Sequence, residues 1–246
     1  MVGINKLMRA SCFRKWLRAP LALLTTLLFM SHPSPSTPTE TSDAPAKPAI
    51  KQIAPGILAI AGRIRLNQRE RTLTIPASVN MREGAIEYLL VTSTGKTHES
   101  ILRTDVEPYH VHVAMLLLGA KGRGTNAFPE DPSRALPGDT IRIEVSWTSG
   151  EKRERMRAED LVFNRKTKKA MKHSDWVYNG SEIGPEGFAA QQTGSIVSLI
   201  TDSEALVNNP LPLRADDDNW TPATNNVPAV GTPVDLVITL VRAQKR

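Results

Sequence analysis

The chain has 246 residues and a net charge of +6, from 31 Lys and Arg residues and 25 Asp and Glu residues. Five of the basic residues and none of the acidic ones lie within residues 1–30, so the remainder holds 26 basic and 25 acidic residues and lacks the positive excess that drives nucleic-acid binding. The single cysteine, Cys12, lies in the same segment, and the rest of the chain therefore excludes disulfides, thiolate metal sites, iron–sulfur clusters and cysteine nucleophiles.

Residues 1–30 have the pattern of a targeting segment. Basic residues precede an apolar run over residues 20–30, which is as long as a signal-peptide core but shorter than the roughly 20 residues that span a bilayer. We predict a signal peptide, or an uncleaved N-terminal anchor that would tether the protein to a membrane. Both alternatives predict an exported protein, periplasmic or extracellular.

Residues 31–55 predict a disordered linker. This range holds six prolines among Ser, Thr and Ala residues, a composition that favours extended conformations and cannot form a packed core. Apolar residues then recur densely, and residues 56–244 predict a single globular domain.

Most of this domain is predicted to be β-strand. Residues 64–66 and 72–75 flank the polar residues 67–70 and predict a hairpin. Residues 140–148 alternate apolar and polar side chains, and a turn at Ser149 and Gly150 leads into a strand over residues 152–157. Further strands are predicted over residues 86–92, 176–178, 195–200 and 234–241.

Two segments predict helices. Pro108 suits a first helical position and Gly119 suits the residue after a helix, which predicts an apolar helix over residues 108–118 with Leu117 on its buried face. Residues 201–204 have the sequence of a capping box, which predicts a short second helix that ends before Pro210. The predicted fold class is therefore α+β, a predominantly antiparallel β-sheet with one apolar helix and one short helix.

Several short motifs resemble the YdjY-domain family. The resemblance begins in residues 82–92 and continues in Gly95-Lys96-Thr97-His98-Glu99-Ser100 and in residues 116–119. It extends over most of residues 60–241, through the segments 157–161, 194–197, 200–202 and 208–210. The resemblance implies a bacterial exported domain, and it carries over neither an established activity nor catalytic residues.

His98 and Glu99 are candidates both for ligand binding and for holding a metal. They follow the predicted turn at Gly95, and functional side chains often lie on such loops. Imidazole and carboxylate groups both bind divalent metals. His98 could instead act as a base toward Ser100, although no Gly-x-Ser-x-Gly motif is present. A structural role around the turn is the remaining alternative.

Three further residues are candidates for a metal site. His110 lies on the predicted helix two positions before His112, and residues two apart on a helix point away from each other, so the pair does not predict a chelate. Asp216 and Asp218 belong to an acidic loop that could hold a hard cation, or that accepts backbone hydrogen bonds in turns. No cofactor is expected, although the residue types allow a divalent metal.

Arg153, Arg155 and Arg157 alternate along one predicted strand and are candidates for anion binding. Such a face could meet an anionic component of a cell envelope, such as a lipid headgroup or an acidic glycan. The alternative is a solvated strand whose charges discourage edge-to-edge aggregation.

The sequence as a whole predicts an exported accessory or binding module of the cell envelope that is not an enzyme. Its partner would be an envelope component, without a nucleic-acid partner and without an assigned catalytic residue. The alternative function is a metal-dependent enzyme with a site around His98 and Glu99.

Overall fold

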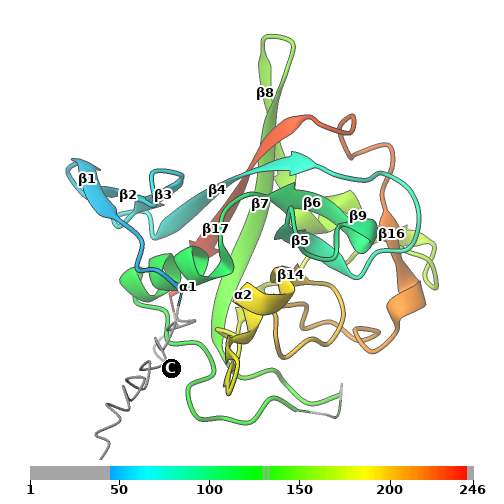
Figure 1. The fold of residues 1–246 in the computed structure, drawn as a ribbon. Helices are drawn as coiled ribbons and strands as arrows, with labels where there is room; N and C mark the ends of the chain where they lie inside the picture. Colours follow the sequence, from blue (N-terminus) through cyan, green and yellow to red (C-terminus); the bar gives the residue numbers. More distant parts are fainter. Residues whose placement is uncertain (1–44, 130, 132, 243–246) are drawn as a thin grey trace, which may run out of the picture. The chain divides into compact units, whose positions relative to one another are not determined.

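A closed β-barrel of eight strands organises the computed structural model, which describes residues 45–129, 131 and 133–242 (Figure 1). Around the barrel the strands follow the order β4 (Thr72–Val79), β17 (Pro233–Leu240), β7 (Asp139–Ser149), β11 (Trp176–Tyr178), β15 (Val207–Asn208), β14 (Ser195–Ser198), β5 (Tyr88–Thr92) and β6 (Ser100–Thr104). Strand β6 then pairs with β4 and closes the ring. Closure pairs strands that would otherwise leave free edges.

The predicted α+β fold class is wrong, because the described part of the chain is mostly β and its main sheet is closed. The sheet is also not uniformly antiparallel, since β5 pairs in parallel with β6 and β14 pairs in parallel with β15. An alternating pattern identifies a strand without identifying its partner. The pairing of β4 with β6 therefore could not be read from the pattern.

Three strands extend the sheet away from the barrel at β4, in the order β1 (Ile50–Ala54), β2 (Ile57–Ile60) and β3 (Ile64–Asn67). Strand β1 lies inside the range predicted as linker, so ordered structure begins before residue 56. The predicted signal peptide or anchor over residues 1–30, and the linker up to residue 44, lie outside the described residues.

Smaller strands complete the fold. Strand β8 (Lys152–Arg157) pairs only with β7, and its hairpin projects from the barrel (Figure 1). A three-stranded sheet contains β10 (Lys169–Ala170), β9 (Val162–Asn164) and β16 (Trp220–Pro222). Strands β12 (Ile183–Gly184) and β13 (Gly187–Phe188) form a short hairpin.

Two predicted hairpins are confirmed. In the first, β3 and β4 pair with Arg65 opposite Thr74. In the second, β7 and β8 pair across the turn at Gly150, whose φ of +59° suits a residue without a Cβ. The alternating residues of β7 place Ile141 and Ile143 in the core. Local pairing was therefore accessible from the sequence.

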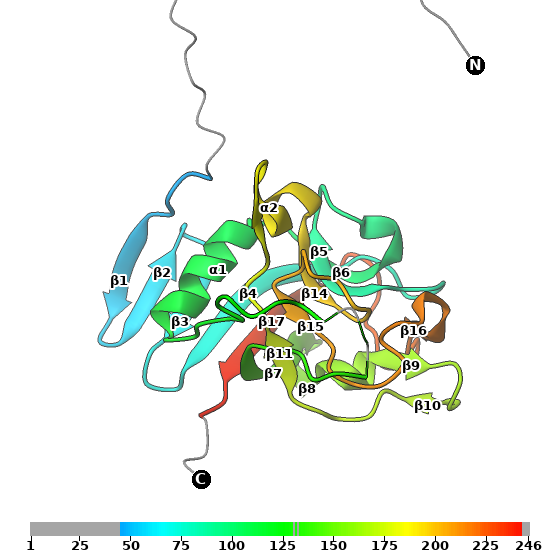
Figure 2. The same cartoon turned by 90° about the horizontal axis from the view of Figure 1, so that it is seen from below.

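The predicted apolar helix is confirmed as α1, Pro108–Leu117. Its buried residues include Val111, Ala114 and Met115, and it lies beside β3 and α2 (Figure 2). Leu117 is 41% exposed, so the expectation that it lies on the buried face is wrong. Within the described residues, no helix has the length and apolar character needed to cross a membrane.

The predicted second helix, which would begin at the capping box of residues 201–204 and end before Pro210, is wrong, because residues 203–206 form a bend and Val207–Asn208 is strand β15. The Glu204 N–H donates to Asp202 Oδ1 at 2.9 Å, a local bond of the kind that competes with helix formation. The second helix is instead α2, Ala189–Thr193, which ends at Gly194 with φ +73°. A Cβ at Gly194 would lie 2.3 Å from the Thr92 side chain, so the close approach of α2 to β5 requires glycine there.

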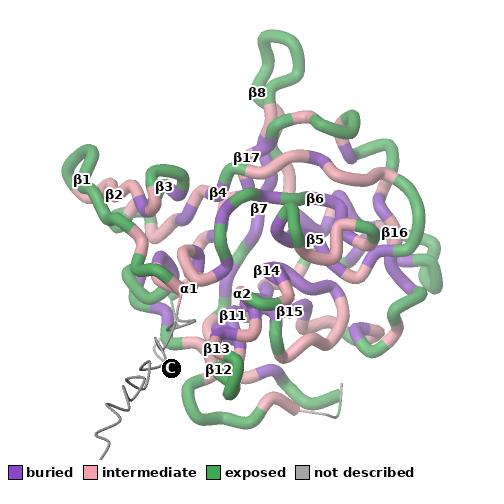
Figure 3. Tube along the Cα trace, in the orientation of Figure 1, coloured by how far each residue is buried: buried purple, intermediate pink, exposed green. Residues whose placement is uncertain are grey.

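The buried residues run through the barrel, and the exposed ones include β1 and the tip of the β8 hairpin (Figure 3). Trp176, Tyr88 and Trp220 are among the largest fully buried side chains. The helices α1 and α2 contribute to the same apolar core. The barrel is therefore a packed scaffold whose functional surfaces lie on its outside and at its loops.

Candidate functional site

Two adjoining hollows lie on the outer wall of the barrel. The first, of about 400 Å³, is lined by residues of β4 and β6 where these strands meet. The second, of about 340 Å³, is lined by residues of β3, β4, β17, β7 and β8. Arg63 and Pro76 line both. Five arginines line the pair, which we call the outer arginine hollow: Arg63, Arg65, Arg103, Arg153 and Arg155.

The strand register brings these arginines together from distant parts of the chain. Arg65 lies between two buried residues of β3, so the alternation of side chains turns it outward. Arg103 of β6 lies opposite Ser78 of β4, and Arg155 of β8 lies opposite Ser146 of β7. The small serine side chains leave space beside the guanidinium groups.

Positive charge exceeds negative charge in the outer arginine hollow. Three of the five arginines have a carboxylate partner: Arg63 with Asp105 at 3.5 Å, Arg153 with Asp235 at 2.6 Å, and Arg155 with Glu144. Arg65 and Arg103 are exposed, and neither forms an ion pair with any described residue. Two guanidinium groups are thus available for an external anion.

Asp105 is the one acidic residue that lines the first hollow. The Ser93 hydroxyl donates to Asp105 Oδ1 at 2.6 Å, and this bond, together with the nearby charge of Arg63, lowers the pKa of the carboxyl group. Asp105 is therefore ionised at neutral pH and offsets one arginine. The remaining excess is still positive.

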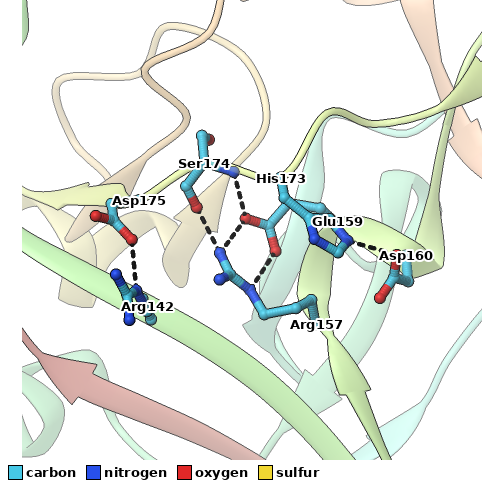
Figure 4. Close-up of polar contacts among 7 residues, drawn as sticks. All are labelled: Arg142, Arg157, Glu159, Asp160, His173, Ser174 and Asp175. Carbon is cyan, nitrogen blue, oxygen red and sulfur yellow. Dashed lines mark hydrogen bonds and ion pairs between the residues drawn. The ribbon is translucent and has the colours of Figure 1, made fainter.

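Arg157, the third arginine of β8, is partly buried and lies in a polar cluster around the buried Glu159 instead (Figure 4). Its Nε and Nη2 atoms donate to the two oxygens of Glu159 at 3.1 and 2.6 Å, and Nη2 also donates to the Ser174 carbonyl at 2.6 Å. Glu159 belongs to the 3-10 turn η2 (Ala158–Leu161), is fully buried and accepts a further bond from the Ser174 N–H. Hydrogen bonding to Glu159 raises the pKa of Arg157.

The same cluster holds residues 173–175 in place beside Arg157. His173 Nε2 lies 2.7 Å from Asp160 Oδ1, and Arg142 Nε donates to Asp175 Oδ1 at 2.8 Å (Figure 4). Because Arg157 Nη2 donates to the Ser174 carbonyl, this residue joins β8 to residues 173–175. Sequence reasoning grouped Arg157 with the ligand candidates Arg153 and Arg155, and the structure separates it from them.

His98 and Glu99 lie on the 3-10 turn η1 (Thr97–Glu99). The His98 side chain is 79% exposed, and its Nε2 lies 3.7 Å from Glu99 Oε2. Ser100 is buried, and its hydroxyl donates to the Leu102 carbonyl at 2.8 Å. The two candidates are therefore adjacent, but the serine that His98 would have to activate is already hydrogen-bonded within its own strand.

A hydrogen-bonded chain beside this turn was missed by sequence reasoning. Lys96 Nζ donates to the Tyr88 hydroxyl at 2.7 Å, and that hydroxyl donates to Asp202 Oδ2 at 2.9 Å. Burial and then the Asp202 charge raise the pKa of Tyr88, so the hydroxyl stays protonated. Tyr88, Lys96 and Asp202 all lie in sequence motifs that carry the family resemblance. That shared membership was the signal in the sequence that could have linked the three segments.

The two helix histidines have separate partners. His110 Nε2 lies 3.6 Å from Glu107, whereas His112 Nδ1 is hydrogen-bonded to the Tyr178 hydroxyl at 2.7 Å. Burial lowers the pKa of His112 and keeps its ring neutral. Neither histidine is paired with the other.

The acidic loop is tied to neighbouring basic residues. Asp216 forms an ion pair with Lys166, and the Asp218 carbonyl accepts a bond from Arg165 at 2.9 Å. Asp218 belongs to the 3-10 turn η3 (Asp217–Asn219). Across residues 45–129, 131 and 133–242, no three His, Cys, Asp or Glu side chains are grouped so that they could hold a metal ion. The five metal candidates are thus distributed over η1, α1 and the η3 loop.

The fold and these surfaces define a closed-barrel domain with a cationic outer hollow. A family model of the YdjY domain matches residues 64–239, and the chain therefore belongs to the YdjY-domain family, as the sequence motifs predicted. Neither curated proteins nor solved structures include a match to the chain.

Proposed function

We propose that this protein is an exported accessory module of the cell envelope that binds an acidic glycan through the outer arginine hollow. The observation that carries this proposal is the pair Arg65 and Arg103, which line the hollow without a carboxylate partner in the described chain. The planar guanidinium group binds carboxylate and phosphate groups through two parallel hydrogen bonds. The hollow therefore suits a ligand that presents such groups.

The shape of the surface favours a polymer chain over a membrane. Two adjoining hollows of about 400 and 340 Å³ can admit acidic groups that project from successive sugars. A bilayer presents its headgroups in a plane, which does not follow two hollows in a curved barrel wall. Binding of linked groups in both hollows would also raise the overall affinity, because the second contact is intramolecular.

The location and the absence of an enzymatic role rest on other features. Export is predicted from the basic and apolar pattern of residues 1–30. The near balance of charge in the rest of the chain argues against nucleic acid as the polyanion. The alternative, a metal-dependent enzyme at His98 and Glu99, has less support because these two residues have no third ligand grouped with them in the described part.

Titration with a carboxylated polysaccharide tests the proposal. We expect saturable binding of alginate oligosaccharides and no binding of neutral dextran by isothermal titration calorimetry. Raising the salt concentration should weaken the binding, because exposed charges are screened. The double variant R65E/R103E should bind at least tenfold more weakly. The matched control K51E/K121E makes the same change of net charge at exposed lysines that do not line the hollow.

Three results would contradict the proposal. Equal weakening in both double variants would mean that only net charge matters. Binding of vesicles that contain acidic phospholipids, with no binding of alginate, would reassign the hollow to a membrane surface. Stoichiometric metal in protein purified without chelator, lost in H98A, would favour the enzyme alternative.

A further inference from the structure

A third cavity differs from the two hollows in its surface chemistry. It lies between the three-stranded sheet of β10, β9 and β16 and the loop that precedes η3. It has a volume of about 410 Å³, within the range of small-molecule sites. Its lining comes from the β9–β10 hairpin, from residues 211–213 and from β16. Unlike the outer arginine hollow, it has a mostly apolar wall, formed by Leu211, Pro212, Leu213, Ala170 and Trp220.

Two lysines lie at this apolar cavity. Lys169 and Lys172 are exposed and line it, and neither forms an ion pair with any residue that the structure describes. Nearby Lys166, in contrast, is paired with Asp216. The cavity therefore combines an apolar wall with two ammonium groups whose charge is not offset.

An unsatisfied donor lies at the same place. Trp220 is 1% exposed and lines the cavity, and its Nε1 has no hydrogen-bond acceptor among the described residues. A buried donor without an acceptor costs about 1–3 kcal/mol. The Trp220 N–H group would be satisfied by a ligand that brings an acceptor oxygen.

The backbone of the loop is also strained at the cavity wall. Leu213 has φ of +72°, a left-handed conformation that a residue with a branched side chain rarely adopts. Such conformations persist where the surroundings impose them, and they are frequent at ligand sites. Here the conformation keeps the Leu213 side chain in the cavity lining.

We propose that this cavity binds a small amphiphilic anion, with an apolar body against Trp220 and Leu213 and an oxygen-rich anionic head near Lys169 and Lys172. The ligand class is a carboxylate or phosphate ester that carries an alkyl chain or an aromatic ring. A neutral apolar molecule would leave both lysines and the Trp220 N–H group without partners, and a cationic amphiphile would be repelled.

Dodecanoate, kept below its micelle concentration, is the probe. We expect saturable binding of one dodecanoate per full-length chain, measured by calorimetry, together with a change in tryptophan fluorescence that is absent in W220F. Dodecyltrimethylammonium, which has the same tail and the opposite charge, should bind at least tenfold more weakly. The variant K169E/K172E should lose at least tenfold in dodecanoate affinity, whereas K51E/K121E should retain the affinity of the unmodified chain.

A variant that fills the space separates binding from folding. Ala170 lines the cavity on an exposed strand, so A170W should occupy it and abolish dodecanoate binding while leaving the melting temperature within a few degrees. The proposal is overturned if dodecanoate does not bind saturably, if both amphiphiles bind equally, or if A170W and K169E/K172E bind as tightly as the unmodified chain. Since alginate binding involves other residues, its failure would leave this result unaffected.

Discussion

The three arginines of β8 share one strand and one alternating pattern, yet they lie in two different environments. Arg153 and Arg155 have side chains that are 60% and 56% exposed, and they line the outer arginine hollow. Arg157 is 23% exposed, and its partner Glu159 is fully buried. Alternation determines which side of a strand a side chain occupies. The environment on that side depends on other segments, here the following turn η2 and residues 173–175, and it decides whether an arginine is a structural contact or a ligand contact.

The largest expected effect is in the buried cluster. Replacing Glu159 with alanine leaves Arg157 without its carboxylate, and removing one partner of a buried ion pair costs about 3–5 kcal/mol. The free energy of unfolding in urea should fall by this amount. The matched change on β7, E144A, removes the partner of the exposed Arg155 and should cost about 0–1 kcal/mol. Equal losses in the two variants would remove the distinction between the environments.

A conservative change should also separate the two ends. In R157K the positive charge remains, but lysine cannot donate the two parallel bonds that arginine gives to Glu159. Loss of one charged hydrogen bond is worth about 1.5–3 kcal/mol. R155K should change stability by less than about 0.5 kcal/mol, as surface substitutions usually do. A stable R157K protein would show that charge alone maintains the cluster.

The histidines extend the comparison to pH. Burial holds the pKa of His112 below its ordinary value of 6.5, so the unfolded chain takes up a proton near pH 6.5 that the folded protein resists. The unfolding free energy should therefore decrease as the pH falls below about 6.5. In H112L this contribution should disappear, whereas H98L, at an exposed site, should retain it. Chemical denaturation at several pH values measures the slopes, and identical slopes in both variants would reject the assignment.

The smallest expected effect is at the exposed pair of Arg153 and Asp235. Their atoms are 2.6 Å apart, but both side chains are more than one-third exposed, so solvent screens the attraction. A double-mutant cycle with R153A and D235A should give a coupling energy of about 0.2–1 kcal/mol. A coupling as large as the loss in E159A would mean that the hollow is stabilised like the interior.

The sequence allowed good prediction of local elements and poor prediction of long-range ones. The hairpins at residues 67–70 and at Gly150, and the helix that starts at Pro108, depend on residues close together in the chain, and all three are confirmed. Closure of the barrel joins residues 78 and 79 to residues 102 and 103. No local pattern specifies that pairing, and α2, with five residues, is too short to show a helical period.

The residues of the candidate sites also divide into those that a local pattern identifies and those that only long-range pairing brings together. Arg153 and Arg155 were predicted, since alternation on one strand identifies them as neighbours. Arg65 and Arg103 were missed, because single arginines on other strands join the hollow only through the register of the sheet. The Asp202 turn was misread as a helix start because its side chain is also the acceptor for Tyr88, a contact 114 residues away in the chain.

The seam between β4 and β6 has a mechanical consequence. The two strands overlap over only a short stretch, where Ser78 and Val79 face Arg103 and Leu102, and the Thr104 hydroxyl adds a bond to the Pro76 carbonyl at 2.6 Å. The barrel is thus closed at the place where the outer arginine hollow lies. A polymer that contacts Arg103 on β6 and Arg65 on β3 would bridge the pairing of β4 with β6. A bound ligand would therefore stabilise the barrel against opening at this pairing. The Asn80 amide donates to the Ile101 carbonyl next to this strand pairing, so slower hydrogen exchange at this amide in the presence of ligand would report the stabilisation directly.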